Sequence, residues 1–187
     1  QQIGNAKAYL YLETEQQPTI TYALSDGKIK NISEKDNCIV FHFADAQQIN
    51  IRYGVSFISE EQAKNNLIRE IPDYNIDKII EQGRNIWNEA LGKIKVKGSD
   101  ENQKTIFYTS MYRVYERPIC ISEDGHYYSG FDGKIHDDRG TPFYTDDWLW
   151  DTFRAAHPLR IIIDPQKENE ILNSFIRMAE QRDNYWT

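Results

Sequence analysis

The hydrophobic periodicity of the sequence changes at Ser59, and this change constrains the fold more than any other feature. Before Ser59, apolar residues alternate with polar ones, as in strands that bury one face. After it, apolar residues recur at three- and four-residue intervals, which is the spacing of amphipathic helices. Strands followed by helices favour separate β and α units over an alternating βαβ fold. We therefore predict an α+β chain, with an antiparallel sheet in residues 1–58 and helices from residue 59 onward.

Four runs rich in β-forming residues predict the strands of the first region. In the last run, five apolar side chains alternate with small or polar residues, so we expect them to share a face that points into a core. These side chains are Ile49, Ile51, Tyr53, Val55 and Phe57. Four strands cannot easily close a sandwich by themselves, so we expect part of a larger antiparallel sandwich. The four runs are residues 8–14, 19–24, 38–43 and 49–57.

Start and stop signals divide the second region into helices. Ser59 begins a capping-box pattern, and Pro72 is expected to end the helix that follows it. A fourth helix is expected from near Asp146, with Pro158 kinking or ending it, and a fifth from the Asp164-Pro165 pair. The buried stripe of the fifth is predicted to comprise Ile171, Leu172, Phe175, Ile176 and Ala179. The second and third helices are predicted at residues 75–95 and 100–116.

Charge and motif content exclude several classes of function. The chain carries 29 acidic and 22 basic side chains, for a net charge of −7, which disfavours nucleic-acid binding. No apolar run reaches the roughly 18 residues that a membrane span needs. The sequence also lacks a dinucleotide-binding glycine motif, a phosphate-binding loop and a helical zinc motif. Since both ends of the sequence resemble cut points, we expect an internal piece of a longer chain.

A long segment at residues 118–145 is dense in Gly, Asp and Tyr and is predicted to be largely irregular. Long loops of this kind are usually functional or disordered, and the aromatic content disfavours disorder. The acidic residues suggest calcium, but the segment alone lacks the required number of ligands. We therefore predict no metal site from it.

The next segment combines an indole, two carboxylates and a guanidinium at helical spacing. On a helix, Asp147, Trp150, Asp151 and Arg154 would share one face. Charged groups of this kind hydrogen-bond vicinal hydroxyls, and an indole covers the apolar face of a sugar ring. The face therefore predicts a sugar-binding wall. The alternative is a surface ion pair between Asp151 and Arg154 beside a half-buried indole, which would contribute little to stability.

The histidines give no evidence of catalysis. A lone histidine is more often a hydrogen-bonded structural residue than a base. We expect His157, which precedes Pro158, to orient the end of a helix, and we assign no catalytic role to His126 or His136.

At two of these segments the sequence resembles the family 92 glycoside hydrolases, which are calcium-dependent bacterial α-mannosidases. The segments are GFDGKIH at residues 130–136 and WDTFRAAHPL at residues 150–159. The likeness extends to YGVSFIS at residues 53–59, WNEAL at 87–91 and FYT at 107–109. The residues just before Trp150, and those at 116–118, depart from the commoner family pattern, so the exact linkage specificity is left open.

The resemblance implies a division into three parts. Residues 1–58 would end an N-terminal β-sandwich, residues 59–98 would form a helical linker, and residues 99–187 would begin an (α/α)6 catalytic barrel. It also implies an inverting exo-acting enzyme, of the α-1,2 type, that trims mannose from glycans outside the cytoplasm, in the periplasm, on the cell surface or after secretion. Asp151 is implied to bind the terminal mannose.

The resemblance places the general acid, the general base and most calcium ligands outside this chain, in the remainder of the protein. Inverting hydrolysis needs the acid and the base on opposite sides of the bond. Two rival readings remain, namely a non-catalytic carbohydrate-binding or scaffold module and a purely structural helical domain.

Overall fold

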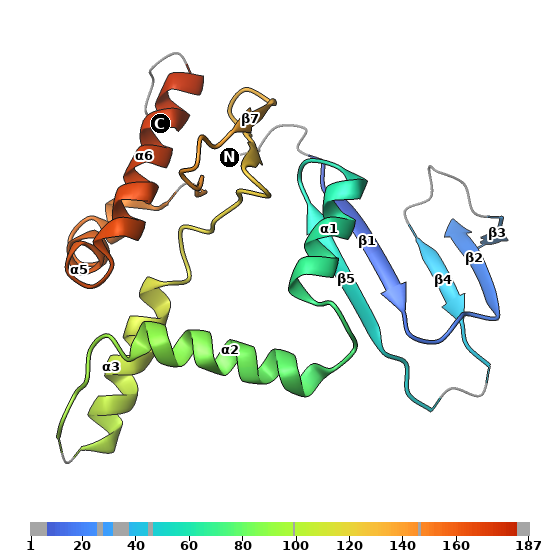
Figure 1. Cartoon of the computed structure of the whole chain (residues 1–187), viewed down its shortest axis with the longest axis horizontal. Coiled ribbons are helices and arrows are strands. Elements are labelled where there is room, and N and C mark those ends of the chain that lie inside the picture. The colour runs from blue at the N-terminus through green and yellow to red at the C-terminus, as the bar shows by residue number, and fades with distance from the viewer. Residues whose placement is uncertain are drawn as a thin grey trace.

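The computed structural model describes residues 7–25, 28–31, 38–44, 47–98, 100–145 and 147–182. Figure 1 shows the strands of the first region at one end of the molecule, helix α2 leading away from them, and the C-terminal helices at the other end. The last strand of the first region ends at Ser56 and the first helix begins at Glu60. The predicted change from strands to helices at Ser59 is therefore confirmed.

The strands of the first region form two antiparallel sheets. In one, β1 (Tyr9–Thr14) pairs with β5 (Ile51–Ser56), with Tyr9 opposite Ser56. In the other, the order is β3-β2-β4, formed by β2 (Ile20–Ser25), β3 (Lys28–Lys30) and β4 (Ile39–His42). The four expected runs all contain strands, and β3 is an additional one. The antiparallel prediction is confirmed.

Helix α1 (Glu60–Glu70) packs on the β1-β5 sheet. The Ser59 side chain accepts a hydrogen bond from the Gln62 backbone N–H, and the C-cap residue is Ile71, just before Pro72, as predicted. The helix buries Ala63 and Leu67 against the strand. An added Cβ on Gly54 would lie 2.2 Å from the Ala63 carbonyl oxygen, so glycine is what lets the helix approach this closely.

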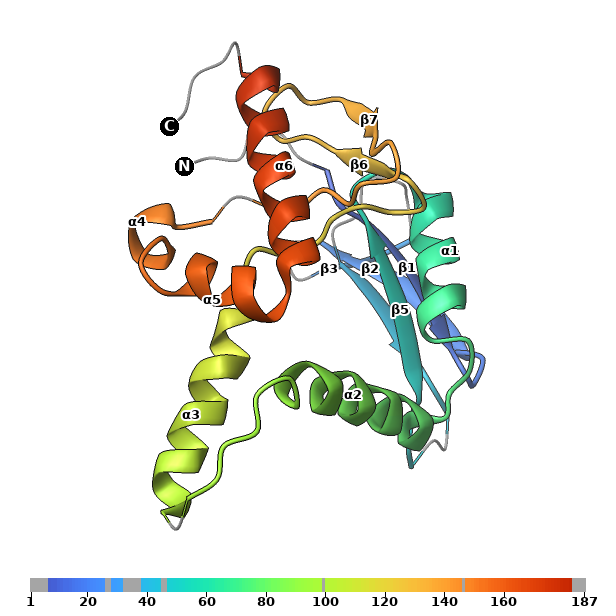
Figure 2. The same cartoon turned by 60° about the vertical axis from the view of Figure 1, so that its left-hand side comes forward.

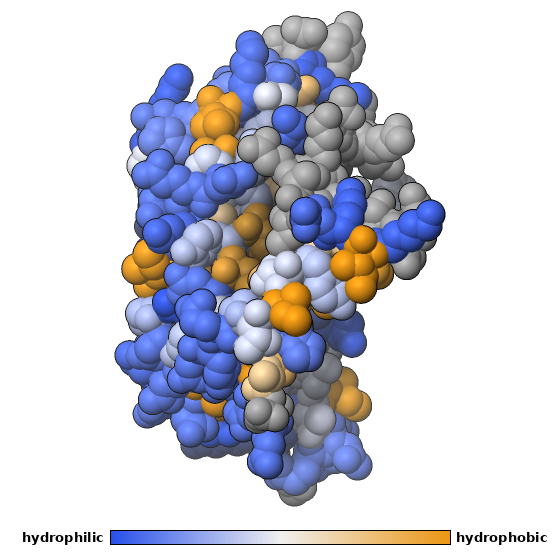
Figure 3. All heavy atoms as spheres, turned by 90° about the vertical axis from the view of Figure 1, so that its right-hand side faces the viewer, coloured by the Kyte–Doolittle hydropathy of each residue, from blue (hydrophilic) through white to orange (hydrophobic). Residues whose placement is uncertain are grey.

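The prediction that the apolar face of β5 points into a core is wrong. Helix α1 covers the face of β5 that carries the small residues instead. Ser56 is 1% exposed, whereas Tyr53 and Val55 on the opposite face are 57% and 44% exposed. The alternation of residue types correctly separated the two faces of β5. It could not show which of the two faces α1 would cover. Among the described residues, nothing buries the apolar face. Figure 3 shows, on the strand-bearing side of the molecule, apolar groups interspersed with hydrophilic ones.

We expect Gly54→Ala to reduce the free energy of unfolding by about 3 kcal/mol, since overpacking a rigid contact costs up to that amount. The added methyl would meet backbone atoms of α1, which cannot rotate away. Gly83→Ala in α2 is the matched control, because its Cβ would meet nothing within 4 Å. The control should gain about 1 kcal/mol from helix propensity. Urea denaturation of both variants measures the difference, and equal stabilities would contradict the packing account.

Two long helices follow. Helix α2 (Ile76–Leu91) has the N-cap Asn75, and helix α3 (Glu101–Val114) has the N-cap Asp100, whose side chains accept backbone hydrogen bonds. Both helices begin one residue after the predicted start and end before the predicted residues 95 and 116. Helix α2 has no buried residue. Trp87 on α2 contacts Tyr112 on α3, with ring centroids 4.5 Å apart. No helix among the described residues is both long and apolar enough to cross a membrane.

The segment predicted to be irregular is more ordered than expected. It contains a hairpin of β6 (His126–Tyr128) and β7 (Ile135–Asp137), with Gly133 at φ 73° in the connecting turn. The Tyr127 ring stacks on Phe143 at a centroid separation of 3.9 Å, and these rings join the principal core. That core consists of Tyr127, Phe143, Tyr144, Ile171, Phe175 and Met178.

The prediction of a single helix that starts near Asp146 is wrong. The structure has α4 (Leu149–Thr152) and α5 (Ala156–Ile163), separated at residues 153–155, while Asp146 lies outside the described residues. Pro158 neither kinks nor ends a helix. It lies in the first turn of α5, where the missing N–H has no intrahelical partner to lose.

Helix α6 (Pro165–Gln181) starts at the predicted Asp164-Pro165 pair. Its buried stripe is narrower than predicted, because the helix packs mainly on the hairpin segment. Ile171 and Phe175 are buried, but Leu172 and Ile176 are 44% and 53% exposed. The fold is thus a mixed α+β arrangement with antiparallel sheets, and the complete barrel stays a prediction.

Candidate functional site

The segment around α4 carries the residues predicted to bind sugar. Figure 2 shows α4 beside α5, on the side of the molecule away from the strands. Two hydrogen bonds form the turn of α4. The backbone N–H groups of Asp151 and Thr152 donate to the Trp148 carbonyl at 2.8 and 3.1 Å. The Arg117 guanidinium lies over the Trp148 ring, 4.7 Å from its centroid. Tertiary contacts therefore help to hold this short turn at the surface.

Three of the four predicted residues gather at the surface on and just after this turn. Trp150 is 87% exposed, and Asp151 and Arg154 are also exposed. The Trp150 ring lies 6.3 Å from the Phe153 ring, and the Arg154 guanidinium lies 5.6 Å from the same ring. The result is an open surface with an indole, a carboxylate and a guanidinium. We call it the α4 surface, defined by Trp150, Asp151 and Arg154.

The Asp151 carboxylate has no hydrogen-bond or ion-pair partner among the residues that the structure describes. In particular, the alternative of an ordinary ion pair between Asp151 and Arg154 is not formed, since Arg154 contacts Phe153 instead. An exposed carboxylate that keeps its acceptor sites free can take hydrogen bonds from the hydroxyls of a ligand.

Asp147 does not join the α4 surface, so the prediction that all four residues share one helix face is wrong. Asp147 precedes α4, and its side chain is only 2% exposed. One carboxylate oxygen accepts from the Trp148 backbone N–H at 2.7 Å, and the other faces His157 and Arg160. The error arose because helical spacing was applied to residues that are not in one helix.

Comparison with known proteins identifies the family to which this segment and the hairpin belong. A family model described as the glycosyl hydrolase family 92 catalytic domain matches residues 62–187, which include the hairpin and the α4 surface. The chain belongs to glycosyl hydrolase family 92.

Solved family 92 structures share the fold across nearly all of the chain. The inverting mannosidase BT2199 from Bacteroides thetaiotaomicron is similar with a TM-score of 0.79 and 27% identity, over 94% of this chain and 25% of that one. The family 92 glycosyl hydrolase ccman5 is similar with a TM-score of 0.83 and 26% identity, over the same shares. An uncharacterized secreted glycosidase from Arthroderma benhamiae is 39% identical over 71 residues, which are 35% of this chain and 9% of that protein. This family 92 chain thus spans about a quarter of the length of the solved structures and less of that relative.

Two acidic residues of the hairpin segment have structural roles that the sequence did not reveal. Glu123 is 8% exposed, and its carboxylate accepts from the Phe57 backbone N–H at 2.9 Å and from the Asn66 side chain at 2.7 Å. Asp124 pairs with Arg69 of α1. These carboxylates join the β5-α1 unit to the segment that leads to the α4 surface. The one signal in the sequence was the polar Asn66 on the buried face of α1, because a buried amide needs a hydrogen-bond partner.

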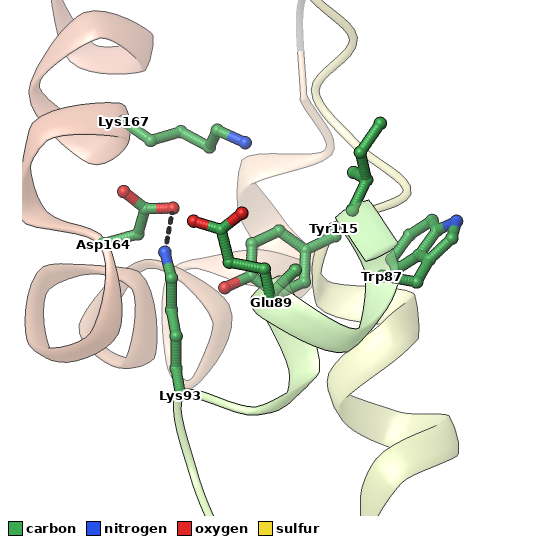
Figure 4. A pocket seen from close by; sticks show the side chains of 8 residues that line it. Trp87, Glu89, Lys93, Tyr115, Asp164 and Lys167 are labelled. Atoms are coloured by element: carbon green, nitrogen blue, oxygen red, sulfur yellow. Dashed lines mark hydrogen bonds and ion pairs between the residues drawn. The ribbon is translucent and has the colours of Figure 1, made fainter. Parts of the chain in front are cut away.

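A cavity of about 290 Å³ lies between α2, the end of α3 and the start of α6. Figure 4 shows Lys93 reaching Asp164 across it, with the Nζ–Oδ2 distance at 2.7 Å, and Glu89, Tyr115 and Lys167 around it. Burial opposes the charged form of Lys93, but the Asp164 carboxylate and the Tyr115 hydroxyl outweigh it and raise the lysine pKa. Two carboxylates balance two ammonium groups, so the cavity does not favour an anion.

The resemblance implied calcium, which takes roughly six to eight oxygen ligands. Among the described residues of this family 92 chain, no group of three or more His, Cys, Asp or Glu side chains is placed to hold a metal ion.

Proposed function

We propose that this chain is part of an inverting exo-α-mannosidase of the α-1,2 type, and that the α4 surface is one wall of its site for terminal mannose. The observation that carries the proposal is the unpaired Asp151 carboxylate beside the exposed Trp150, within the region matched by the family 92 catalytic domain. The indole would cover the apolar face of the sugar, and the carboxylate would accept from its hydroxyls. BT2199, which shares the fold, is itself an inverting mannosidase.

The general acid and base are proposed to come from the rest of the protein. Inversion requires two carboxyl groups on opposite sides of the scissile bond with a water molecule between. Three carboxylates of the hairpin segment that could be considered for these roles are already engaged. Glu123 is buried in hydrogen bonds, Asp124 pairs with Arg69, and Asp132 binds the His136 ring at 2.9 Å. Calcium is likewise proposed for the whole protein, with most ligands outside this chain.

The experiment is to incubate the full-length protein with an α-1,2-linked mannobiose and calcium, and to follow the anomeric protons by NMR. We expect β-mannose to appear first, because inversion at an α-linkage gives the β-anomer before mutarotation. α-Mannose as the first product would contradict inversion. Binding of mannobiose without cleavage would instead support the rival non-catalytic carbohydrate-binding module.

A further inference from the structure

Four ionisable side chains from three segments meet in the interior beside the α4 surface. They come from the segment before α4, from α5 and from α6. The four, here called the ionic cluster, are Asp147, His157, Arg160 and Glu168, whose side chains are 2%, 10%, 3% and 3% exposed. Burying so many charges is costly, so their arrangement needs an explanation.

The histidine is the centre of the ionic cluster. His157 Nδ1 lies 2.6 Å from Glu168 Oε1, within hydrogen-bonding distance. This hydrogen bond fixes the ring so that Nε2 faces Asp147 Oδ2 at 3.5 Å. Arg160 Nη1 lies 3.8 Å from Asp147 Oδ2 and 3.9 Å from Glu168 Oε2.

Each member of the ionic cluster also has one buried polar atom without a hydrogen-bond partner among the described residues. These atoms are Asp147 Oδ2, His157 Nε2, Arg160 Nη1 and Glu168 Oε2. Apart from the bond between His157 and Glu168, the contacts within the cluster are 3.5–3.9 Å long, and Arg160 places its guanidinium beside both the Asp147 and the Glu168 carboxylates. Within the cluster, Asp147 Oδ2 faces His157 Nε2 and Arg160 Nη1.

Asp147 connects the ionic cluster to the α4 surface. Its Oδ1 accepts from the Trp148 N–H at 2.7 Å, and the Trp148 carbonyl accepts from the Asp151 N–H at 2.8 Å. Helix α4 has only four residues and no side-chain cap of its own. A helical turn of that length is not stable by itself, so its position must come from outside contacts.

We propose that the ionic cluster holds the α4 turn in the orientation that binds sugar, which makes its four members positioning residues for Trp150 and Asp151. The inference rests on the proposed function, because it names the residues that support the same site. It also corrects the sequence-based role of Asp147, which acts through Asp151 rather than on the substrate.

The test is a double-mutant cycle on the full-length protein, with kcat and KM for mannobiose measured well below the unfolding temperature. We expect Asp147→Asn to lower kcat/KM by about 10-fold, mainly through KM, and Asp151→Asn by about 100-fold. Because Asp147 acts through Trp150 and Asp151, the double variant should lose much less than the product of the two single losses. Losses that multiply to about 1000-fold, or unchanged kinetics in Asp147→Asn, would overturn the inference. Asp77→Asn on the exposed face of α2 is the matched control.

A second readout does not depend on activity. The indole N–H signals of Trp148 and Trp150 should move in Asp147→Asn, whereas that of Trp87 should not. Glu168→Gln keeps the shape of the side chain and is the second variant to use if Asp147→Asn fails to fold. It should move the same two signals. If the wild-type protein released no mannose, the proposed function would fail and the indole spectra alone would decide. Unmoved Trp148 and Trp150 signals would then overturn the positioning role as well.

Discussion

Replacing Asp151 by Asn in the full-length protein is expected to lower kcat/KM for a terminal α-mannoside by about 100-fold, equivalent to about 2.7 kcal/mol of transition-state stabilisation. A hydrogen bond to a charged group contributes about 1.5–3 kcal/mol. The Asp151 carboxylate has no partner among the described residues, so its acceptor capacity is free for vicinal sugar hydroxyls. The amide keeps the shape of the side chain, but it removes the charge and replaces one acceptor oxygen by a donor.

Asp77→Asn removes the same charge from an exposed position in the first turn of α2 and should leave kcat/KM unchanged. Both variants should unfold at nearly the wild-type temperature, since Asp151 and Asp77 are exposed. Asp151→Asn with wild-type kcat and KM would remove the α4 surface from the substrate site. Equal losses in both variants would point to a general effect of charge instead.

Replacing Arg160 by Met is expected to reduce the free energy of unfolding by about 3–5 kcal/mol, the usual result of removing one partner from a buried ion pair. The guanidinium is the permanent positive charge beside the Asp147 and Glu168 carboxylates. Its Nη2 also donates to the Val114 carbonyl at 2.8 Å and to that of Arg117. Methionine fills much of the same volume, so the loss reports charge and hydrogen bonding rather than a cavity.

Arg154→Met is the matched control for this stability measurement. Arg154 is exposed and contacts only the face of Phe153 among the described residues, an interaction of about 1 kcal/mol or less. Calorimetric unfolding of both variants measures the difference. If Arg160→Met were as stable as Arg154→Met, the buried contacts of Arg160 would not contribute the expected free energy to the fold.

Local signals in the sequence predicted much of the fold. Ser59 is an N-cap as expected, and α2 and α3 begin within one residue of their predicted starts, because a helix start depends on a few neighbouring residues. The choice of buried face was not local. The alternation in β5 separated its two faces correctly, but α1 covers the face that contains Gly54, and only the three-dimensional packing shows this.

The candidate site was predicted in part for a similar reason. Trp150, Asp151 and Arg154 lie together at the surface, which their spacing suggested. The spacing failed for Asp147, because the chain leaves the helix at both ends of α4 and the carboxylate turns towards His157 and Arg160. A buried charge cluster formed by three separate segments has no periodic signature, so its members could not be recognised together before the fold was known.

The central claim is that the α4 surface contacts the terminal mannose of the substrate. The most direct measurement is a crystal structure of the full-length protein with a mannose-configured inhibitor bound. The account predicts sugar hydroxyls within hydrogen-bonding distance of the Asp151 carboxylate and the Trp150 indole against the ring. An inhibitor bound elsewhere, with Asp151 and Trp150 still facing solvent, would contradict it.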